Sequence, residues 1–444
     1  MRRSALALLL AAASAAPAAA QTLADRPVTL AHDEAPPVDR PKNLVLFIAD
    51  GFGPASATLG RAAKGRPLAF DSVLVGSVET SATDSRVTDS AAGATAYACG
   101  IKTYNGAIGV DAEGRPCRTL LEAAEARGMA TGLVATSRIT HATPASFAAH
   151  VAQRSEEAEI ARQMAASGVD LLLGGGASFF ENGPWGDLDG AGYALARTRA
   201  EYDALGRLPA AALLAPSHLA YEVDRDETDQ PSLADMTTRA LRLLAASADG
   251  EANGFFVMIE GSRIDHAGHA NDPAAHAHDI LAYDAAVAAA LEWAARDGNT
   301  LVVATADHET GGLSLGRDGV YEWDPAPLLA ATASVERVAE RLGQGGDPVE
   351  TVREALGVDS LSAETAEAVR GAAASQDAAA VSLLVRTLAS ESARVGWTTG
   401  GHTAVDVGLY AWGPGAERFV GAVPNAAVGR ALFGVLGFEP GRGD

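Results

Sequence analysis

The sequence predicts an α/β fold, with a doubly wound, mostly parallel central sheet, helices on both faces and an inserted helical subdomain. Short continuous apolar segments recur along the chain, and Ala-, Glu- and Arg-rich segments of helical character separate them. The apolar segments do not alternate with polar residues, which is typical of strands buried on both faces. Strands that alternate with amphipathic helices indicate a sheet covered by helices on both sides.

The predicted strands are followed by polar residues. The first strand covers 43–49 and stops at Asp50. Further strands are predicted at 131–135, 169–173, 255–259, 301–305 and 409–412, and helices at 119–127, 156–166 and 273–295. Glu260 follows one of these strands and Asp307 another. Because doubly wound sheets bind ligands at the carboxyl ends of their strands, we expect these side chains to meet in one site.

Residues 316–395 have a different character. They are rich in Ala and Glu, contain a Gly-Gln-Gly-Gly break and show little strand pattern. We interpret them as a helical insertion in a single catalytic domain that covers 41–444. The glycines at 174–176 lack the Lys-Ser/Thr ending of a phosphate-binding loop, so we expect only a tight turn there.

The first twenty residues have the features of a signal peptide. Arg2 and Arg3 precede an apolar stretch at 5–13, and three alanines at 18–20 form a small-residue cleavage site. The alternative is a buried N-terminal helix. We therefore expect an exported protein, periplasmic or secreted, followed at 21–40 by a Pro- and acid-rich arm or linker. No later apolar run is long enough to span a bilayer, so we expect no membrane insertion.

The charge of the chain is strongly acidic. The formal net charge is −22, and loss of Arg2 and Arg3 lowers 34 basic residues to 32 against 56 acidic ones, which gives −24. This balance argues against nucleic acid as a specific partner. A phosphate ester would need strong local positive charge, which metal ions could supply.

Cys99 and Cys117 are the two cysteines, and they could form a disulfide or remain separate thiols.

Three segments carry candidate catalytic residues. Ser90 precedes an Ala-rich helix whose N-terminus would direct backbone N–H groups at an anion, although such a Ser is on its own usually an N-cap. Asp265 and His269 are four residues apart and share a helix face, although this spacing alone is more often a surface pair. The adjacent Asp307 and His308 follow a strand, and His402 is a further imidazole. Taken alone, a single His is usually structural.

Together these residues offer carboxylates, imidazoles and a hydroxyl at the ends of core strands. Such a set suits two zinc ions and a third, harder ion. His276 and His278 have no carboxylate partner at a strand end, so we assign them to a solvated helix face.

The motifs closely resemble those of the alkaline phosphatase family. Matching segments follow one another in order: Asp50-Gly-Phe-Gly, Val87-Thr-Asp-Ser-Ala-Ala, Ile139-Thr-His-Ala-Thr-Pro, His150-Val-Ala-Gln-Arg, Glu260-Gly-Ser-Arg-Ile-Asp-His-Ala-Gly-His, Thr305-Ala-Asp-His-Glu and Gly401-His-Thr. The resemblance covers about 41–315 and 396–436.

The resemblance implies a role for each candidate residue. One zinc would be held by Asp265, His269 and His402, and the other by Asp50, Asp307 and His308. Magnesium would be held by Asp50, Thr143 and Glu260. Arg154 would clamp the phosphate, with Asp89 orienting it. His141 would lie next to the magnesium ligands, and His266 would contact phosphate through water; both positions hold other residues in some bacterial members.

The resemblance also implies the reaction. Phosphate monoesters would be hydrolysed to alcohol and inorganic phosphate through a phosphoserine intermediate on Ser90, assisted by two zinc ions and one magnesium ion. Small phosphate monoesters would be the substrates, and a homodimer is expected. A related phosphodiesterase or sulfatase on the same fold is the alternative, and a binding protein without turnover is a second one.

Overall fold

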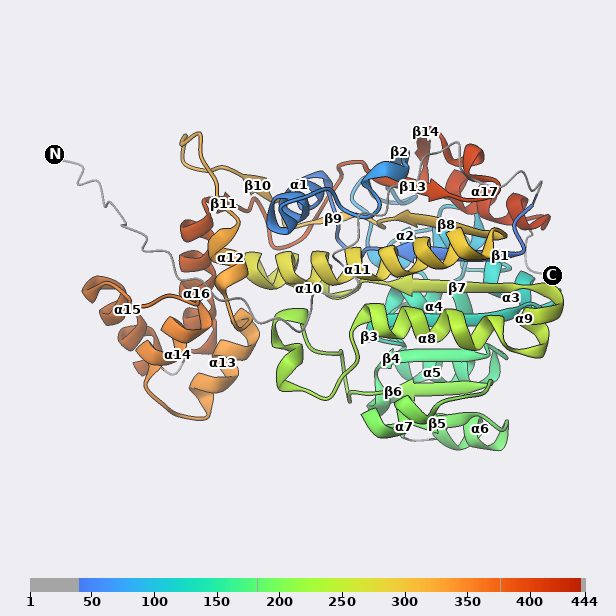
Figure 1. Ribbon diagram of the computed structural model, residues 1–444, viewed down its shortest axis with the longest axis horizontal. Coiled ribbons are helices and arrows are strands. Elements are labelled where there is room, and N and C mark those ends of the chain that lie inside the picture. Colours follow the sequence, from blue (N-terminus) through green and yellow to red (C-terminus); the bar gives the residue numbers. More distant parts are fainter. Residues whose placement is uncertain (1–39, 182, 376, 441–444) are drawn as a thin grey trace.

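The structure is a computed structural model that describes residues 40–440 apart from 182 and 376 (Figure 1). The signal peptide predicted at 1–20 lies outside the described residues, as does the arm predicted at 21–40 except for its last residue. Among the described residues, no helix is both long enough and apolar enough to cross a membrane.

The centre of the molecule is a ten-stranded sheet with the order β14-β2-β13-β8-β1-β7-β3-β4-β6-β5. Its strands are β1 (Asn43–Ile48), β2 (Leu74–Glu79), β3 (Ala130–Arg138), β4 (Leu171–Gly175), β5 (Ala194–Ala196), β6 (Ala210–Leu213), β7 (Phe255–Glu260), β8 (Thr300–Thr305), β13 (Val407–Trp412) and β14 (Gly421–Pro424). Neighbours pair in parallel except at β13, which is antiparallel to both β8 and β2. The predicted mostly parallel sheet is confirmed.

The register of the three central strands places their ends together. Residues of β1, β7 and β8 are buried throughout, as the unbroken apolar runs predicted. Ile48 of β1 pairs with Glu260 on one side and with Thr305 on the other. The segments that follow these three strands therefore begin side by side at one edge of the sheet.

Helices cover both faces of the sheet. Helices α8 and α11 lie in front of the strands in Figure 1, and α3 and α4 lie behind them. The helices of the main body are α1 (Pro54–Lys64), α2 (Ser90–Cys99), α3 (Leu120–Glu125), α4 (Ala142–Ala148), α5 (Glu157–Ala166), α6 (Pro184–Gly190), α7 (Arg199–Ala204), α8 (Leu233–Ala245), α9 (Ala248–Asn253), α10 (Arg263–Ala270), α11 (Pro273–Asp297) and α17 (Asn425–Leu436).

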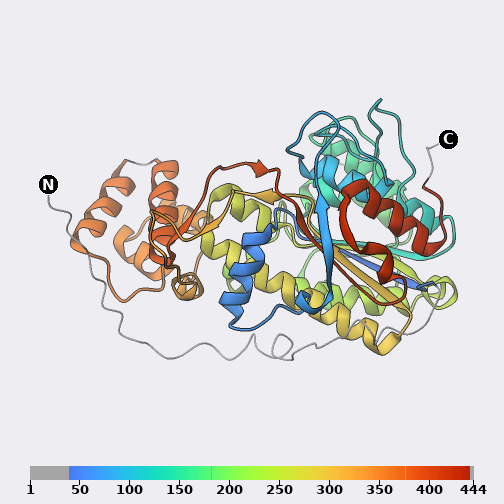
Figure 2. The same ribbon diagram turned by 90° about the horizontal axis from the view of Figure 1, so that it is seen from above.

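A group of five helices, here called the helical segment, projects from one end of the body (Figures 1 and 2). It comprises α12 (Ala326–Ala330), α13 (Val335–Gly343), α14 (Pro348–Ala355), α15 (Ala363–Ala374) and α16 (Ala378–Ala393). Helices α13 to α16 share a small core of their own, which includes Val338, Val352 and Val369. The short strands β10 (Ser314–Leu315) and β11 (Val395–Gly396) pair where the chain enters and leaves the segment. The helices agree with the character predicted for 316–395.

Two expectations about local structure are wrong. His276 is fully buried and lies 2.9 Å from Ser56 Oγ and 3.0 Å from the carbonyl oxygen of Ile264, and His278 is partly buried. The reason is that α11 packs against the sheet, α8 and α10 at once, which leaves it no broad solvated face. The glycines at 174–176 do not all form a turn, because two of them continue β4 and only Gly176 has a positive φ of 95°.

Candidate metal and phosphate site

Acidic side chains meet at the carboxyl edge of the central strands. Asp50 follows β1, Glu260 ends β7 and Asp307 follows β8, and all three are inaccessible to solvent. Asp307 Oδ1 accepts hydrogen bonds from the backbone N–H groups of Gly51 (3.3 Å) and His308 (3.0 Å). The sheet thus gathers the three carboxylates that the sequence predicted to lie together.

Asp50, Asp307 and His308 form the first candidate metal group. Their ligand atoms lie within 4.8 Å of one another. His308 Nε2 is 3.5 Å from Asp50 Oδ1 and 3.3 Å from Asp307 Oδ2. Asp50 Oδ2 and Asp307 Oδ2 are buried without a hydrogen bond among the described residues. Buried polar atoms are normally satisfied, so this group fits a cation.

Asp265, His269 and His402 form the second group. His269 Nδ1 lies 2.7 Å from the carbonyl oxygen of Gly400, and His402 Nδ1 lies 2.8 Å from that of Thr88. A carbonyl can only accept, so in the neutral rings both Nδ1 atoms carry the proton and both Nε2 atoms present lone pairs. These Nε2 atoms are 3.1 Å apart, and they lie 3.4 Å and 3.6 Å from the Asp265 carboxylate.

Lone pairs that face each other and a carboxylate are an arrangement that suits a bound cation. Imidazole ligands of metal ions usually donate their other N–H to a backbone carbonyl, as these two do. The first and second groups adjoin, because the rings of His308 and His402 stack with their centroids 3.5 Å apart.

Asp50 and Glu260 also belong to a third group, in which the third member is His141. Thr143 Oγ1, Glu260 Oε1 and His141 Nδ1 are buried without a hydrogen bond of regular geometry among the described residues. Thr143 lies in the first turn of α4, two residues after the N-cap His141. A ring nitrogen of His141 thus lies within 4.8 Å of the carboxylate oxygens of Asp50 and Glu260.

The carboxylates of the site are costly to ionise without a cation. Burial and the neighbouring Asp307 raise the pKa of Asp50 well above its usual value. Burial, followed by the charge of Asp265, raises the pKa of Asp307 to about 8, and burial raises that of Glu260 to about 7. Burial and the nearby His402 lower the pKa of His308 well below its usual value, so this ring is a neutral ligand. Buried metal ions remove such penalties.

Ser90 lies beside the first group at the start of α2. Its Oγ is 3.4 Å from Asp50 Oδ1 and 3.2 Å from His308 Nε2. Asp89 is the N-cap of α2 and accepts a hydrogen bond from the backbone N–H of Ala92 at 3.0 Å. The hydroxyl therefore lies at a helix N-terminus, where backbone N–H groups and the helix dipole favour an anion.

Arg154 faces the same helix start. Its Nη1 donates to Asp89 Oδ2 at 3.0 Å, and its Nη2 lies 3.0 Å from His141 Nε2. The loop that carries it is held by backbone hydrogen bonds, since the N–H of Arg154 donates to the carbonyl of Gly106 at 2.8 Å. The predicted pairing of Arg154 with Asp89 is therefore present in the structure.

Three neighbouring imidazole rings, those of His141, His266 and His218, begin at the contact between His141 and Arg154. The rings of His266 and His141 lie 5.5 Å apart, and the ring of His218 lies 4.3 Å from that of His266. His218 was missed by the sequence reasoning, because it stands alone in a loop after β6 without a neighbouring ligand-type residue. Thr310 was also missed, although it follows His308 by two residues, and its Oγ1 donates to Asp265 Oδ1 at 2.5 Å.

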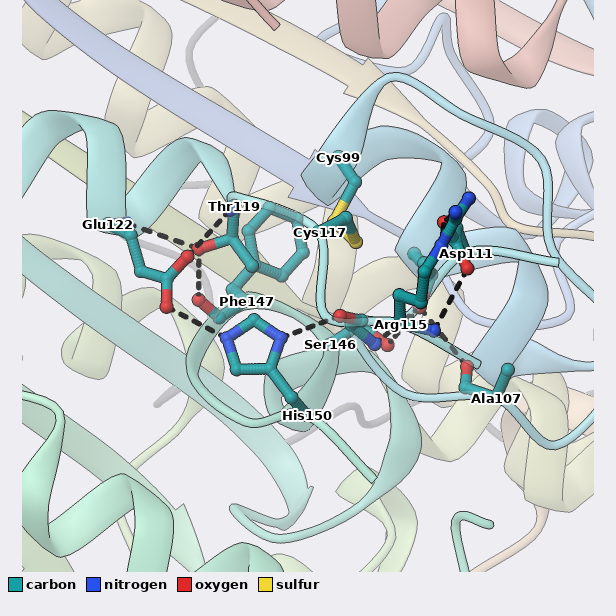
Figure 3. Close-up of a disulfide and its surroundings, with 12 residues drawn as sticks. Cys99, Ala107, Asp111, Arg115, Cys117, Thr119, Glu122, Ser146, Phe147 and His150 are labelled. Atoms are coloured by element: carbon teal, nitrogen blue, oxygen red, sulfur yellow. Dashed lines mark hydrogen bonds and ion pairs between the residues drawn. A yellow bond between two sulfur atoms is a disulfide. The ribbon is translucent and has the colours of Figure 1, made fainter. Parts of the chain in front are cut away.

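The other end of α2 is fixed by a disulfide between Cys99 and Cys117, so the two cysteines are paired (Figure 3). Close by, His150 bridges the carbonyl of Gly109 (2.6 Å) and the carboxylate of Glu122 (2.8 Å). His150 therefore has a structural role, and it helps to hold the chain that leads to Arg154.

Comparisons with known proteins agree with this geometry. Residues 41–438 match the family model described as alkaline phosphatase. The chain is similar to alkaline phosphatase 3 of Bacillus subtilis, with 39% identity over 90% of each chain, and to the repressible alkaline phosphatase of Saccharomyces cerevisiae, with 39% identity over 89% of this chain and 81% of the yeast protein.

Among solved structures, the cold-active alkaline phosphatase of the psychrophile Shewanella sp. has 33% identity and a TM-score of 0.84, covering 89% of this chain and 99% of that one. A variant of the enzyme from the Antarctic bacterium TAB5, described as having magnesium bound in its M3 site, has 29% identity and a TM-score of 0.68 over 90% of this chain and 99% of that one.

Proposed function

Because the chain belongs to the alkaline phosphatase family and is thus a phosphoric monoester hydrolase, we propose that Ser90 is its nucleophile. The supporting observation is the position of the Ser90 hydroxyl, 3.4 Å from Asp50 Oδ1 and 3.2 Å from His308 Nε2 at the N-terminus of α2. A Ser hydroxyl is a weak nucleophile at its ordinary pKa and needs such an environment.

The buried His and Asp groups fit metal ions, and their assignment is part of the proposal. Zinc would be held by Asp265, His269 and His402, and a second zinc by Asp50, Asp307 and His308. Magnesium would be held by Asp50, Thr143 and Glu260; a magnesium ion is described for the M3 site of a TAB5 variant. When bound, these cations would favour the ionised form of the Ser90 hydroxyl and neutralise negative charge on the leaving oxygen.

Arg154 and the start of α2 would bind the phosphate. The guanidinium can offer two parallel N–H groups to two phosphate oxygens, and Asp89 holds it in place. Free backbone N–H groups of the first turn of α2 would bind a third oxygen. His266 would contact the phosphate through water.

The reaction then has two displacements. Ser90 Oγ attacks phosphorus in line with the ester bond, the P–O bond to the alcohol breaks, and the alcohol leaves with a proton. Water attacks the phosphoserine from the side that the alcohol vacated, the P–Oγ bond breaks, and inorganic phosphate is released. The proton of the Ser90 hydroxyl leaves with the alcohol in the first step, and the attacking water returns a proton to the Ser90 oxygen in the second.

We also propose that residues 1–20 direct export to the periplasm or the medium and that the mature enzyme is a homodimer. The disulfide supports export, because disulfides persist in oxidising compartments.

Replacement of Ser90 by Ala tests the nucleophile. We expect turnover of a phosphate monoester to fall by roughly a thousandfold or more, because the covalent route is lost, with zinc and magnesium content unchanged. Ser314→Ala, at an exposed position on β10, is the matched control. Mass spectrometry of acid-quenched wild type should locate phosphate on Ser90. Turnover within tenfold of wild type in Ser90→Ala would disprove the role.

A further inference from the structure

Arg263 is a buried guanidinium that connects the phosphate site with the helical segment. It is the first residue of α10, and its side chain is 6% exposed. Its Nη1 lies 3.0 Å from His266 Nδ1, and its Nη2 donates to Glu336 Oε2 at 3.1 Å. Its Cζ lies 3.7 Å from the centroid of the Tyr221 ring, so the guanidinium also stacks on an aromatic face.

These contacts determine which nitrogen of His266 carries the proton. A guanidinium has only donors, so His266 Nδ1 must accept from Arg263 and the ring proton must be on Nε2. Within the described part of the chain, Nε2 makes no hydrogen bond. The Nε2–H group is thus available to donate to an anion or its bound water. The His266 ring centroid lies 5.5 Å from that of His141, which in turn contacts Arg154.

Glu336 has a fixed position although its side chain is 59% exposed. It is in the first turn of α13, and the start of this helix is anchored by buried hydrogen bonds. Asp224 accepts from the backbone N–H of Ser334 at 2.9 Å, and Asp272 accepts from that of Val335 at 2.7 Å. Glu336 is therefore held over Arg263 by the docking of the helical segment.

We propose that Glu336 is a positioning residue for the phosphate site, acting through Arg263 on His266. Glu336 holds one side of the guanidinium, so the other side stays on His266 Nδ1 and keeps the Nε2–H tautomer directed at the substrate. The helical segment thus contributes to phosphate binding without touching phosphate. This inference rests on the proposed function, because it needs His266 to contact phosphate through water.

A double-mutant cycle on the full-length, cation-loaded enzyme tests the link. KM and the inhibition constant of inorganic phosphate are measured for Glu336→Ala, His266→Ala and the double variant. We expect each single variant to raise both constants about fivefold, the effect of losing one water-mediated contact, with kcat changed less than about twofold. The double variant should match His266→Ala alone, because Glu336 acts only through His266.

The control is Glu350→Ala, which removes an exposed carboxylate paired with Arg353 on α14 of the same segment. It should leave both constants unchanged. An inhibition constant of phosphate in Glu336→Ala equal to that of wild type would overturn the proposal. So would a double variant whose increase in either constant is the product of the increases in the two single variants. Its failure is distinguishable from failure of the nucleophile assignment, because phosphate inhibition reports binding and Ser90→Ala reports turnover.

Discussion

Replacing Glu260 by Gln should stabilise the cation-free protein, and increasingly so as the pH rises. Burial raises the pKa of Glu260 from 4.5 to about 7, so the folded state holds a proton that the unfolded state has released. The resulting stabilisation is complete below pH 4.5 and is lost as the pH rises through about 7. Gln does not titrate, so the variant loses no stability from this position as the pH rises.

The expected size follows from the same shift. Each pKa unit corresponds to about 1.4 kcal/mol, so wild type should lose about 2.5 kcal/mol relative to Glu260→Gln between roughly pH 5 and pH 8.5. The buried His141, His266 and His308 act in the opposite direction, because their lowered pKa values make stability rise with pH up to about 6.5. Their contribution is common to both proteins and cancels in the difference.

The measurement is urea unfolding of chelator-treated wild type and variant at a series of pH values. After reloading with zinc and magnesium, wild type should be more stable than Glu260→Gln, because Glu260 is then an ionised ligand and Gln is a poorer one. Glu367→Gln, at an exposed position within α15 of the helical segment, is the matched control for a Glu-to-Gln exchange away from the site. A difference between wild type and Glu260→Gln that stays flat, or that favours wild type at high pH without cations, would refute the reasoning.

Two further predictions concern the start and the end of α2. Arg154→Lys should raise the inhibition constant of phosphate about tenfold or more, because a point charge cannot make the two parallel hydrogen bonds of a guanidinium. Arg162→Lys on α5 is the control. An unchanged inhibition constant in Arg154→Lys would contradict the role of Arg154. Joint replacement of Cys99 and Cys117 by Ala should lower the free energy of unfolding by about 3 kcal/mol, because the disulfide closes a loop with a sequence separation of 18. Urea unfolding measures this loss, and a midpoint equal to that of wild type would show that the disulfide does not stabilise the fold.

Much of the fold could be predicted because buried strands produce continuous apolar runs. The runs at 43–49, 255–259 and 301–305 correspond to β1, β7 and β8, the strands that bring the carboxylates together. Strands β5 and β6 were not predicted, since their alanines suit a helix equally well. The antiparallel direction of β13 was also unpredictable, because a hydrophobic pattern is the same in both directions.

Residues of the site that lie in sequence motifs could be predicted, and residues that only packing brings near the site could not. Asp265 and His269 share a helix face, so their spacing alone brings them together. His218 lies beside His266 from a loop, and Glu336 contacts Arg263 from a distant helix; nothing adjacent to either in the sequence has the chemistry of a ligand. The pairing of Cys99 with Cys117 depended on distances in space, which spacing does not give.

The candidate cation ligands come from segments separated by most of the chain, from Asp50 to His402. The group of Asp50, Asp307 and His308 cannot be complete until β8 has paired with β1, and the group of Asp265, His269 and His402 also needs the segment around His402 to dock. High-affinity binding should therefore occur late in folding. Ions that bind only the finished fold add RT ln(1 + [ion]/Kd) to its stability, so the concentration of free metal ions around the chain should govern how long the enzyme survives as well as how fast it works.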